Sequence, residues 1–178
     1  MNEILNKLNK IETINVIGNM PNIEPVPIPT KNLNRFQKLK ALFATRKWKL
    51  TKNYILKING ISFFIHKGFI TNWASIPRIF WTVLSPTGPL LIASLFHDFI
   101  YSYNGIIVLE NKEFVFYKMN KSEADHLLKL ITDKVNEVTG FGYVAEKALQ
   151  IGGYFAWHSC RKENEQILND FPYITKFK

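Results

Sequence analysis

Residues 54–65 read YILKINGISFFI, and this stretch decides the fold that we expect. Apolar residues alternate in part before Asn59-Gly60, and a second apolar run follows it. Asn-Gly between two such runs is the strongest short signal of a β-hairpin, because both residues tolerate the positive φ of a tight turn. Residues 105–109 and 113–117 predict a second hairpin that turns through residues 110–112.

Helical patterns dominate the C-terminal part of the chain. Residues 122–125 read SEAD, the pattern of a capping box, and apolar residues recur behind it at helical spacing until Gly140. Residues 143–168 predict a last long helix with an apolar first half (Val144, Ala148, Ile151, Phe155) and a charged second half. We therefore expect an α+β fold, in which two β-hairpins form a small antiparallel sheet packed against a C-terminal helical layer.

The first 45 residues are expected to form an N-terminal arm, and residues 46–178 a single α+β domain. Residues 3–11 are amphipathic, and the prolines of residues 21–29 favour an extended backbone. Residues 33–47 predict a basic amphipathic helix. Its apolar side is expected to pack on the body, since a charged outer face is common, and membrane or nucleic-acid binding is the alternative.

Length, charge and cysteine content limit the kinds of protein that this chain can be. With 178 residues, 47% of them hydrophobic, the chain can bury one core. Its net charge of +9 makes nucleic acid or an anionic polymer possible partners, although lysine is spread along the whole chain. The single cysteine, Cys160, excludes an intramolecular disulfide and a Cys-rich zinc site, and it suggests a reducing compartment.

Two apolar stretches resemble a membrane or an export signal in length or position. Residues 79–96 carry no charge, but Pro86, Gly88 and Pro89 break the run, so we expect no transmembrane segment. Charges at positions 3, 7 and 10 interrupt the apolar N-terminus, so we expect no Sec-dependent secretion.

Polar and titratable residues gather between and after the hairpins. Residues 71–78 read TNWASIPR, residues 97–101 read HDFIY, and residues 123–125 read EAD. These pieces resemble the signature of a phage-associated family, domain of unknown function 1353, written T-[DN]-x-A-S-[IV]-P-R, H-D-x-x-Y and E-A-D. The resemblance covers residues 63–158 and implies kinship without an established activity. Many members have Asp where this chain has Asn72, and a neutral carboxamide would weaken a metal site.

The signature supplies the candidate site residues. His97, Asp98 and Asp125 are candidate ligands of a divalent metal, zinc or manganese, because imidazole and carboxylate groups suit these ions. Neighbouring helical residues point about 100° apart, so His97 and Asp98 share a metal only if it lies in the angle between them. Asn72, Glu123 and His126 are the candidate catalytic residues: Asn72 would orient substrate or water, and either of the other two would be the general base.

Arg78, Ser75 and Tyr101 are the candidate binding residues, with Arg78 as an anion clamp. Structural roles compete with these assignments throughout. Asp125 occupies the fourth position of the predicted capping box, Asn72 suits a side-chain-capped turn, and Arg78 could pair internally with Asp98 or Asp125.

Two functions from different classes follow. The first is a phage-type accessory or virion-associated protein, located in the host cytoplasm or the virion, which docks onto a protein partner through residues 1–47. The alternative is a small metal-dependent hydrolase that acts on a cell-wall or phosphoester substrate. An inhibitor of a host defence enzyme is a third possibility. Asn72 and the long arm favour the accessory protein.

Overall fold

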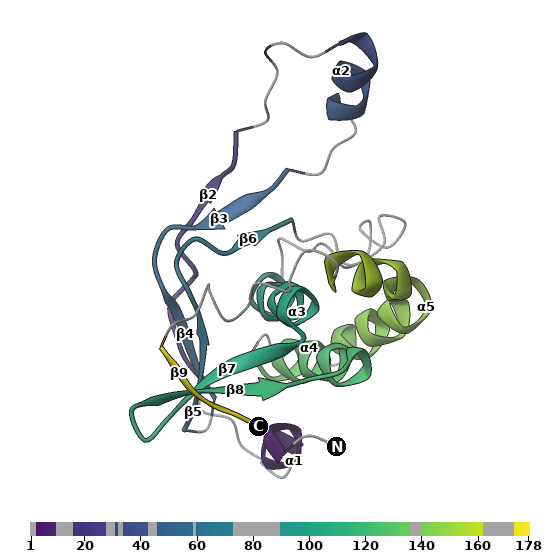
Figure 1. Ribbon diagram of the computed structural model, residues 1–178. Helices are drawn as coiled ribbons and strands as arrows, with labels where there is room; N and C mark the ends of the chain where they lie inside the picture. The colour runs from purple at the N-terminus through teal and green to yellow at the C-terminus, as the bar shows by residue number, and fades with distance from the viewer. Residues whose placement is uncertain are drawn as a thin grey trace.

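The computed structural model describes residues 3–9, 16–27, 31, 34–42, 46–58, 60–72, 90–135, 140–161 and 173–178. Two β-sheets and a group of helices make an α+β fold, as predicted (Figure 1). The helices are α1 (Glu3–Asn9), α2 (Arg35–Leu42), α3 (Leu91–Tyr103), α4 (Lys121–Val135) and α5 (Phe141–Arg161). The strands are β1 (Val16–Ile17), β2 (Ile23–Pro25), β3 (Trp48–Leu50), β4 (Tyr54–Ile58), β5 (Ile61–Ile65), β6 (Ile70–Thr71), β7 (Gly105–Glu110), β8 (Glu113–Lys118) and β9 (Ile174–Phe177).

Both predicted hairpins are present in the larger sheet. β4 and β5 pair antiparallel with Ile58 opposite Ile61, and Gly60 has a φ of 83° at the turn. In the β7–β8 hairpin the turn residues Asn111 and Lys112 have φ values of 51° and 68°. Positive φ at both central positions is typical of a two-residue turn whose twist matches the strands. Glu110 therefore ends β7, and the turn is one residue shorter than expected.

The sheets are more extensive than the two hairpins alone. β5 pairs with β7, which joins the hairpins, and β1 and β9 extend the two edges to give the order β1-β4-β5-β7-β8-β9. β9 runs parallel to β8, whereas the other pairs of this sheet are antiparallel. A second sheet has the order β2-β3-β6.

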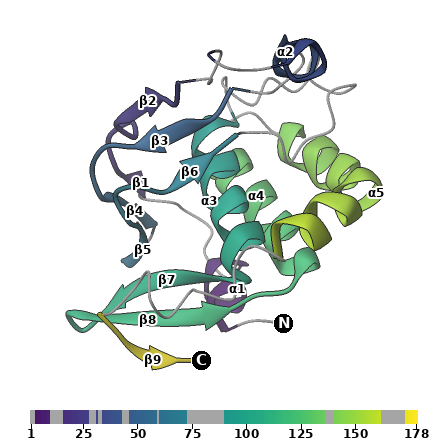
Figure 2. The ribbon, with the colours of Figure 1, turned by 45° about the horizontal axis from the view of Figure 1, so that its top comes forward.

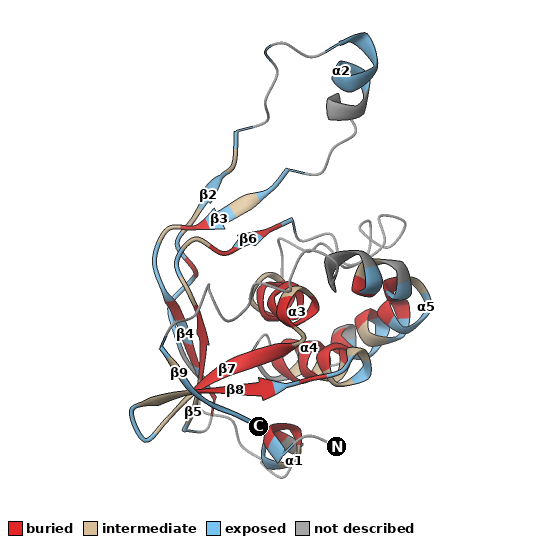
Figure 3. Cartoon of the chain, viewed as in Figure 1, coloured by how far each residue is buried: buried red, intermediate tan, exposed pale blue. Residues whose placement is uncertain are grey.

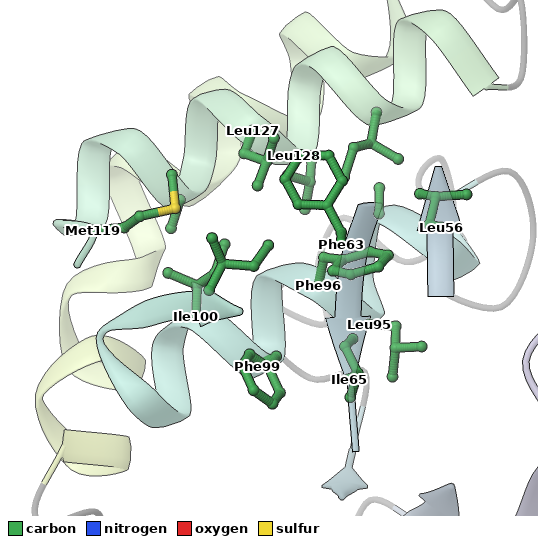
Figure 4. Close-up of a cluster of buried hydrophobic side chains, with 14 of the residues drawn as sticks. Leu56, Phe63, Ile65, Leu95, Phe96, Phe99, Ile100, Met119, Leu127 and Leu128 are labelled. Carbon is green, nitrogen blue, oxygen red and sulfur yellow. The ribbon is translucent and has the colours of Figure 1, made fainter. Parts of the chain in front are cut away.

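The core lies where α3 meets the main sheet and the other helices. α3 contacts β7, α4 and α5, and the three helices lie together above β7 and β8 in Figure 2. Ten of its thirteen residues are buried, including Phe96, whose ring lies 5.9 Å from that of Phe63. Figure 4 shows apolar side chains of β5, α3 and α4 in contact. Polar side chains on so enclosed a helix usually find hydrogen-bond partners inside the protein.

α1 belongs to this core, although it lies within the predicted arm of residues 1–45. Its apolar residues Ile4, Leu5 and Leu8 are buried, and the helix contacts α4. β1, which follows α1, pairs with β4 in the main sheet. The amphipathic pattern predicted the helix correctly, but only tertiary packing could reveal what covers its apolar side.

Two described elements of the predicted arm, β2 and α2, project away from the main sheet (Figure 1). The prediction that the basic helix packs on the body is wrong for the side chains that the structure describes. Phe36 is 81% exposed and Leu39 is 53% exposed (Figure 3). Among the described helices, none is long and apolar enough to cross a membrane.

Candidate functional site

α3 carries His97 and Asp98 into the interior but points them at different partners. His97 is 1% exposed and Asp98 is 6% exposed. The Asp98 carboxylate accepts a hydrogen bond from the Thr71 hydroxyl of β6, whereas His97 faces Asp125 of α4. The divergence follows from the helical angle between neighbouring residues. The two side chains therefore belong to two separate contacts.

Asp125 is the centre of a buried polar group that we call the Asp125 cluster: His97, Tyr101, Lys121 and Asp125. Oδ1 lies 2.9 Å from His97 Nε2 and accepts a hydrogen bond from the Tyr101 hydroxyl at 2.8 Å. Oδ2 accepts from Lys121 Nζ at 2.7 Å. The Asp125 side chain has no exposed surface. Burial of a carboxylate is tolerable only with such a set of donors.

The charge of Asp125 reflects two opposing effects. Burial acts to raise its pKa, since a low-dielectric interior disfavours the charged form. Hydrogen bonds from His97, Lys121 and Tyr101, together with the electrostatic interaction with His97, outweigh burial and hold the pKa of Asp125 below its ordinary value of 3.8. Asp125 is therefore a carboxylate at neutral pH.

The cluster also joins α4 to α5. Lys121 Nζ donates a second hydrogen bond to the Leu149 carbonyl at 2.8 Å. A Cβ at Gly153 would lie 2.7 Å from the Tyr101 hydroxyl, so only glycine allows α5 to approach this closely. The Trp157 ring packs edge-on against Tyr101, with centroids 4.9 Å apart. Lys121, Tyr101, Gly153 and Trp157 therefore all contribute to one junction, at which α5 packs against α3 and α4.

Sequence reasoning missed Lys121, Gly153 and Trp157 as members of this junction. Lys121 precedes Asp125 by four residues, a spacing that places two side chains on the same helix face. That signal was present in the sequence. The contacts of Gly153 and Trp157 needed the packing of α5 against α3, which no local pattern specifies.

The start of α4 differs from the prediction and changes the role of Asp125. The capping box is formed by Asn120 and Glu123: Asn120 Oδ1 accepts from Glu123 N, and Glu123 Oε2 accepts from Asn120 N, both at 3.0 Å. The predicted box that began at Ser122 is therefore wrong by two residues. Asp125 lies beyond the cap and is directed into the core.

The remaining candidates do not gather around Asp125 in the described structure. Glu123 caps α4, and His126 Nδ1 lies 3.2 Å from Glu146 Oε1 of α5. Asn72 directly follows β6 and is exposed. Ser75 and Arg78 lie outside the described residues, so their predicted binding roles stay predictions.

The described residues do not fit the predicted metal site. Among them, no group of three His, Cys, Asp or Glu side chains could hold a metal ion. His97 and Asp125 bond each other, and Asp98 bonds Thr71. His97 Nδ1 is buried without a hydrogen-bond partner, but the carboxylate of the cluster contacts the other ring nitrogen, Nε2. The metal assignment and the hydrolase that depends on it stay predictions, which elemental analysis of wild type and His97→Ala tests.

Comparison with known proteins identifies the family. The model of a family described as a protein of unknown function (DUF1353) matches residues 48–136. The chain belongs to the DUF1353 family. The match runs from β3 to the end of α4 and so contains His97, Asp98 and Asp125. No curated protein matches, and no solved structure matches.

Proposed function

We propose that this DUF1353 protein is a phage-type accessory or virion-associated protein that docks onto a protein partner through the segment from β2 to α2. The observation that carries the proposal is the exposure of Phe36 and Leu39 on a projecting helix. Residues three apart lie on the same side of a helix, so both can enter one apolar pocket. Helix-in-groove recognition uses anchors of this kind.

Charge around α2 suggests the nature of the partner. α2 contains no acidic residue, and Arg35 and Lys38 are exposed beside the apolar pair. Arg46 and Lys47, which precede β3, and Lys49 within β3 are exposed as well. A partner with an acidic rim around an apolar pocket would match both features.

The Asp125 cluster supports the same proposal, because its contacts suit a structural role. Its polar side chains bond one another inside the core, where they join three helices and stabilise the body. A buried network of this kind fits a scaffold that presents a docking segment. The signature residues then maintain the fold, and the projecting segment makes the contact.

A photo-crosslinking amino acid at position 36 tests the proposal in cells that produce the phage. Crosslinking to one phage protein is expected, and Leu39→Asp in the same chain should reduce it. The matched control places the crosslinker at Ile55, an exposed position of β4. Equal crosslinking from positions 36 and 55 would contradict docking through α2. Phe36→Ser and Leu39→Ser should change the free energy of unfolding by less than about 0.5 kcal/mol, because both side chains are exposed.

A further inference from the structure

α5 is apolar on two opposite sides. Its inner side, which includes Ala145, Leu149 and Trp157, is buried against the body. Its outer side exposes four large apolar residues, at 54%, 47%, 82% and 59%: Tyr143, Val144, Ile151 and Tyr154. The predicted apolar face contained Val144 and Ile151, which the structure places outside. A surface helix normally carries polar or charged residues on the side that faces solvent, so an apolar outer side is unusual.

The exposed residues form one continuous strip, which we call the α5 stripe: Tyr143, Val144, Lys147, Ile151, Tyr154 and His158. They recur at intervals of three and four residues, apart from the adjacent first pair, so they share one side of the helix. From position 143 to position 158 the stripe is about 22 Å long, at ~1.5 Å per residue. Exposed apolar patches of a few hundred Å² on a protein surface are often functional.

We infer that the α5 stripe is the interface between two copies of this chain. Lys147 is its only lysine, arginine or acidic residue, and Nζ lies 5.6 Å from the centroid of the Tyr143 ring. The stripe thus offers no charged cluster to a charged partner, in contrast to α2. Two copies of a chain with a net charge of +9 repel each other, and a nearly uncharged apolar face is where that repulsion is smallest.

The distribution of residues along the stripe suits a two-fold axis. Ile151 is its most exposed residue, and Val144 and His158 lie seven positions before and after it. An antiparallel pair of α5 helices crossing at Ile151 would place Val144 against the partner's His158. Lys147, four positions before the axis, would then lie near the partner's Tyr154, three positions after it, where a cation–π contact could form. Such a self-complementary arrangement is the requirement of a two-fold interface.

The size of the stripe sets the expected strength of the dimer. The apolar side chains offer on the order of 400 Å² per copy, or roughly 800 Å² for the pair, which lies below the standard size of stable interfaces. We therefore expect a reversible dimer with a dissociation constant of about 1 μM or weaker. This inference does not depend on docking through α2.

Sedimentation equilibrium of the full chain from about 0.5 to 500 μM, a range that begins below 1 μM and extends well above it, tests the inference. Wild type should shift from monomer to dimer. Ile151→Lys should weaken the dimer at least tenfold, since it would place two lysines together at the axis. Ile55→Lys is the matched control, because it makes the same change at an exposed position of β4. A monomeric wild type at every concentration overturns the inference, as does equal dimerisation by Ile151→Lys and wild type.

Crosslinking tests the two-fold axis separately. In a Cys160→Ser background, Ile151→Cys should oxidise to a disulfide-linked dimer faster than Gln150→Cys, because Gln150 lies at the margin of the stripe. Equal rates for the two variants would refute an axis at Ile151. Circular dichroism of each variant should match wild type, since positions 150 and 151 are both exposed.

Discussion

Asp125→Asn removes the centre of the Asp125 cluster and should destabilise the fold by about 3–5 kcal/mol, the usual cost of breaking a buried ion pair by removing one partner. The carboxylate accepts from His97, Tyr101 and Lys121 and has no exposed surface. A carboxamide has one acceptor oxygen and no charge, so at least one of these donors loses its partner inside the core. The corresponding loss in Tm is roughly 6–20 °C for a domain of this size.

The chain contains a matched control on the same helix. Lys129 and Asp133 repeat the spacing of Lys121 and Asp125, with Nζ 2.8 Å from Oδ2, but their side chains are 27% and 19% exposed. Asp133→Asn keeps an oxygen for Gly142 N and should cost only about 1 kcal/mol. Guanidinium unfolding at pH 7, followed by circular dichroism, measures both variants. Equal costs for Asp125→Asn and Asp133→Asn would refute the assignment of Asp125 as the central buried charge.

Further predictions concern the same cluster and the buried hydroxyl of Tyr54. The pKa of Asp125 in the folded state lies below 3.8, so the charged carboxylate stabilises the fold above that pH, and this contribution is lost at lower pH. The difference in free energy of unfolding between wild type and Asp125→Asn should therefore narrow below about pH 4 in urea titrations. A constant gap would contradict this. Tyr101→Phe should cost about 1–2 kcal/mol, whereas Tyr54→Phe should be neutral or stabilising, because the Tyr54 hydroxyl is buried without a hydrogen-bond partner. The reverse order in thermal unfolding would show that Tyr101 contributes little to the cluster. Gly153→Ala should destabilise by about 1–3 kcal/mol despite a better helix propensity, and Tyr101→Phe in the same chain should reduce that cost by removing the crowded oxygen. If the costs of Gly153→Ala and Tyr101→Phe simply add in a double-mutant cycle, the Tyr101 hydroxyl does not crowd position 153.

Local patterns predicted much of the fold because their causes are local. The β4–β5 hairpin follows from the turn chemistry of Asn59-Gly60, and α4 and α5 follow from apolar residues at helical spacing. The same reasoning missed the capping residue of α4, since both Asn120 and Ser122 are suitable cap residues. It also missed the burial of α1, because an amphipathic helix looks alike whether its apolar side meets the body or a partner.

In the candidate site too, the sequence indicated the positions, whereas only the structure showed their contacts. Sequence comparison of the signature identified His97, Asp98 and Asp125 as special positions, and the family match contains all of them. What each side chain contacts was not readable, because the partners lie 27 residues apart for Thr71 and Asp98 and 28 residues apart for His97 and Asp125. Neighbouring residues of a helix point in different directions, so His97 contacts Asp125 whereas Asp98 contacts Thr71. The pair that suggested one metal site therefore makes two separate contacts.

By itself, the sequence determined the hairpins, the helical C-terminal half and membership of the DUF1353 family, since turn preferences, periodicity and family signatures are carried by neighbouring residues. Only the tertiary structure decided that Asp125 is enclosed by three helices, that α1 belongs to the core, and that Phe36, Leu39 and Ile151 face outward. Burial depends on which segments meet in space. Hydrophobicity tells which residues prefer to be covered, but not what covers them.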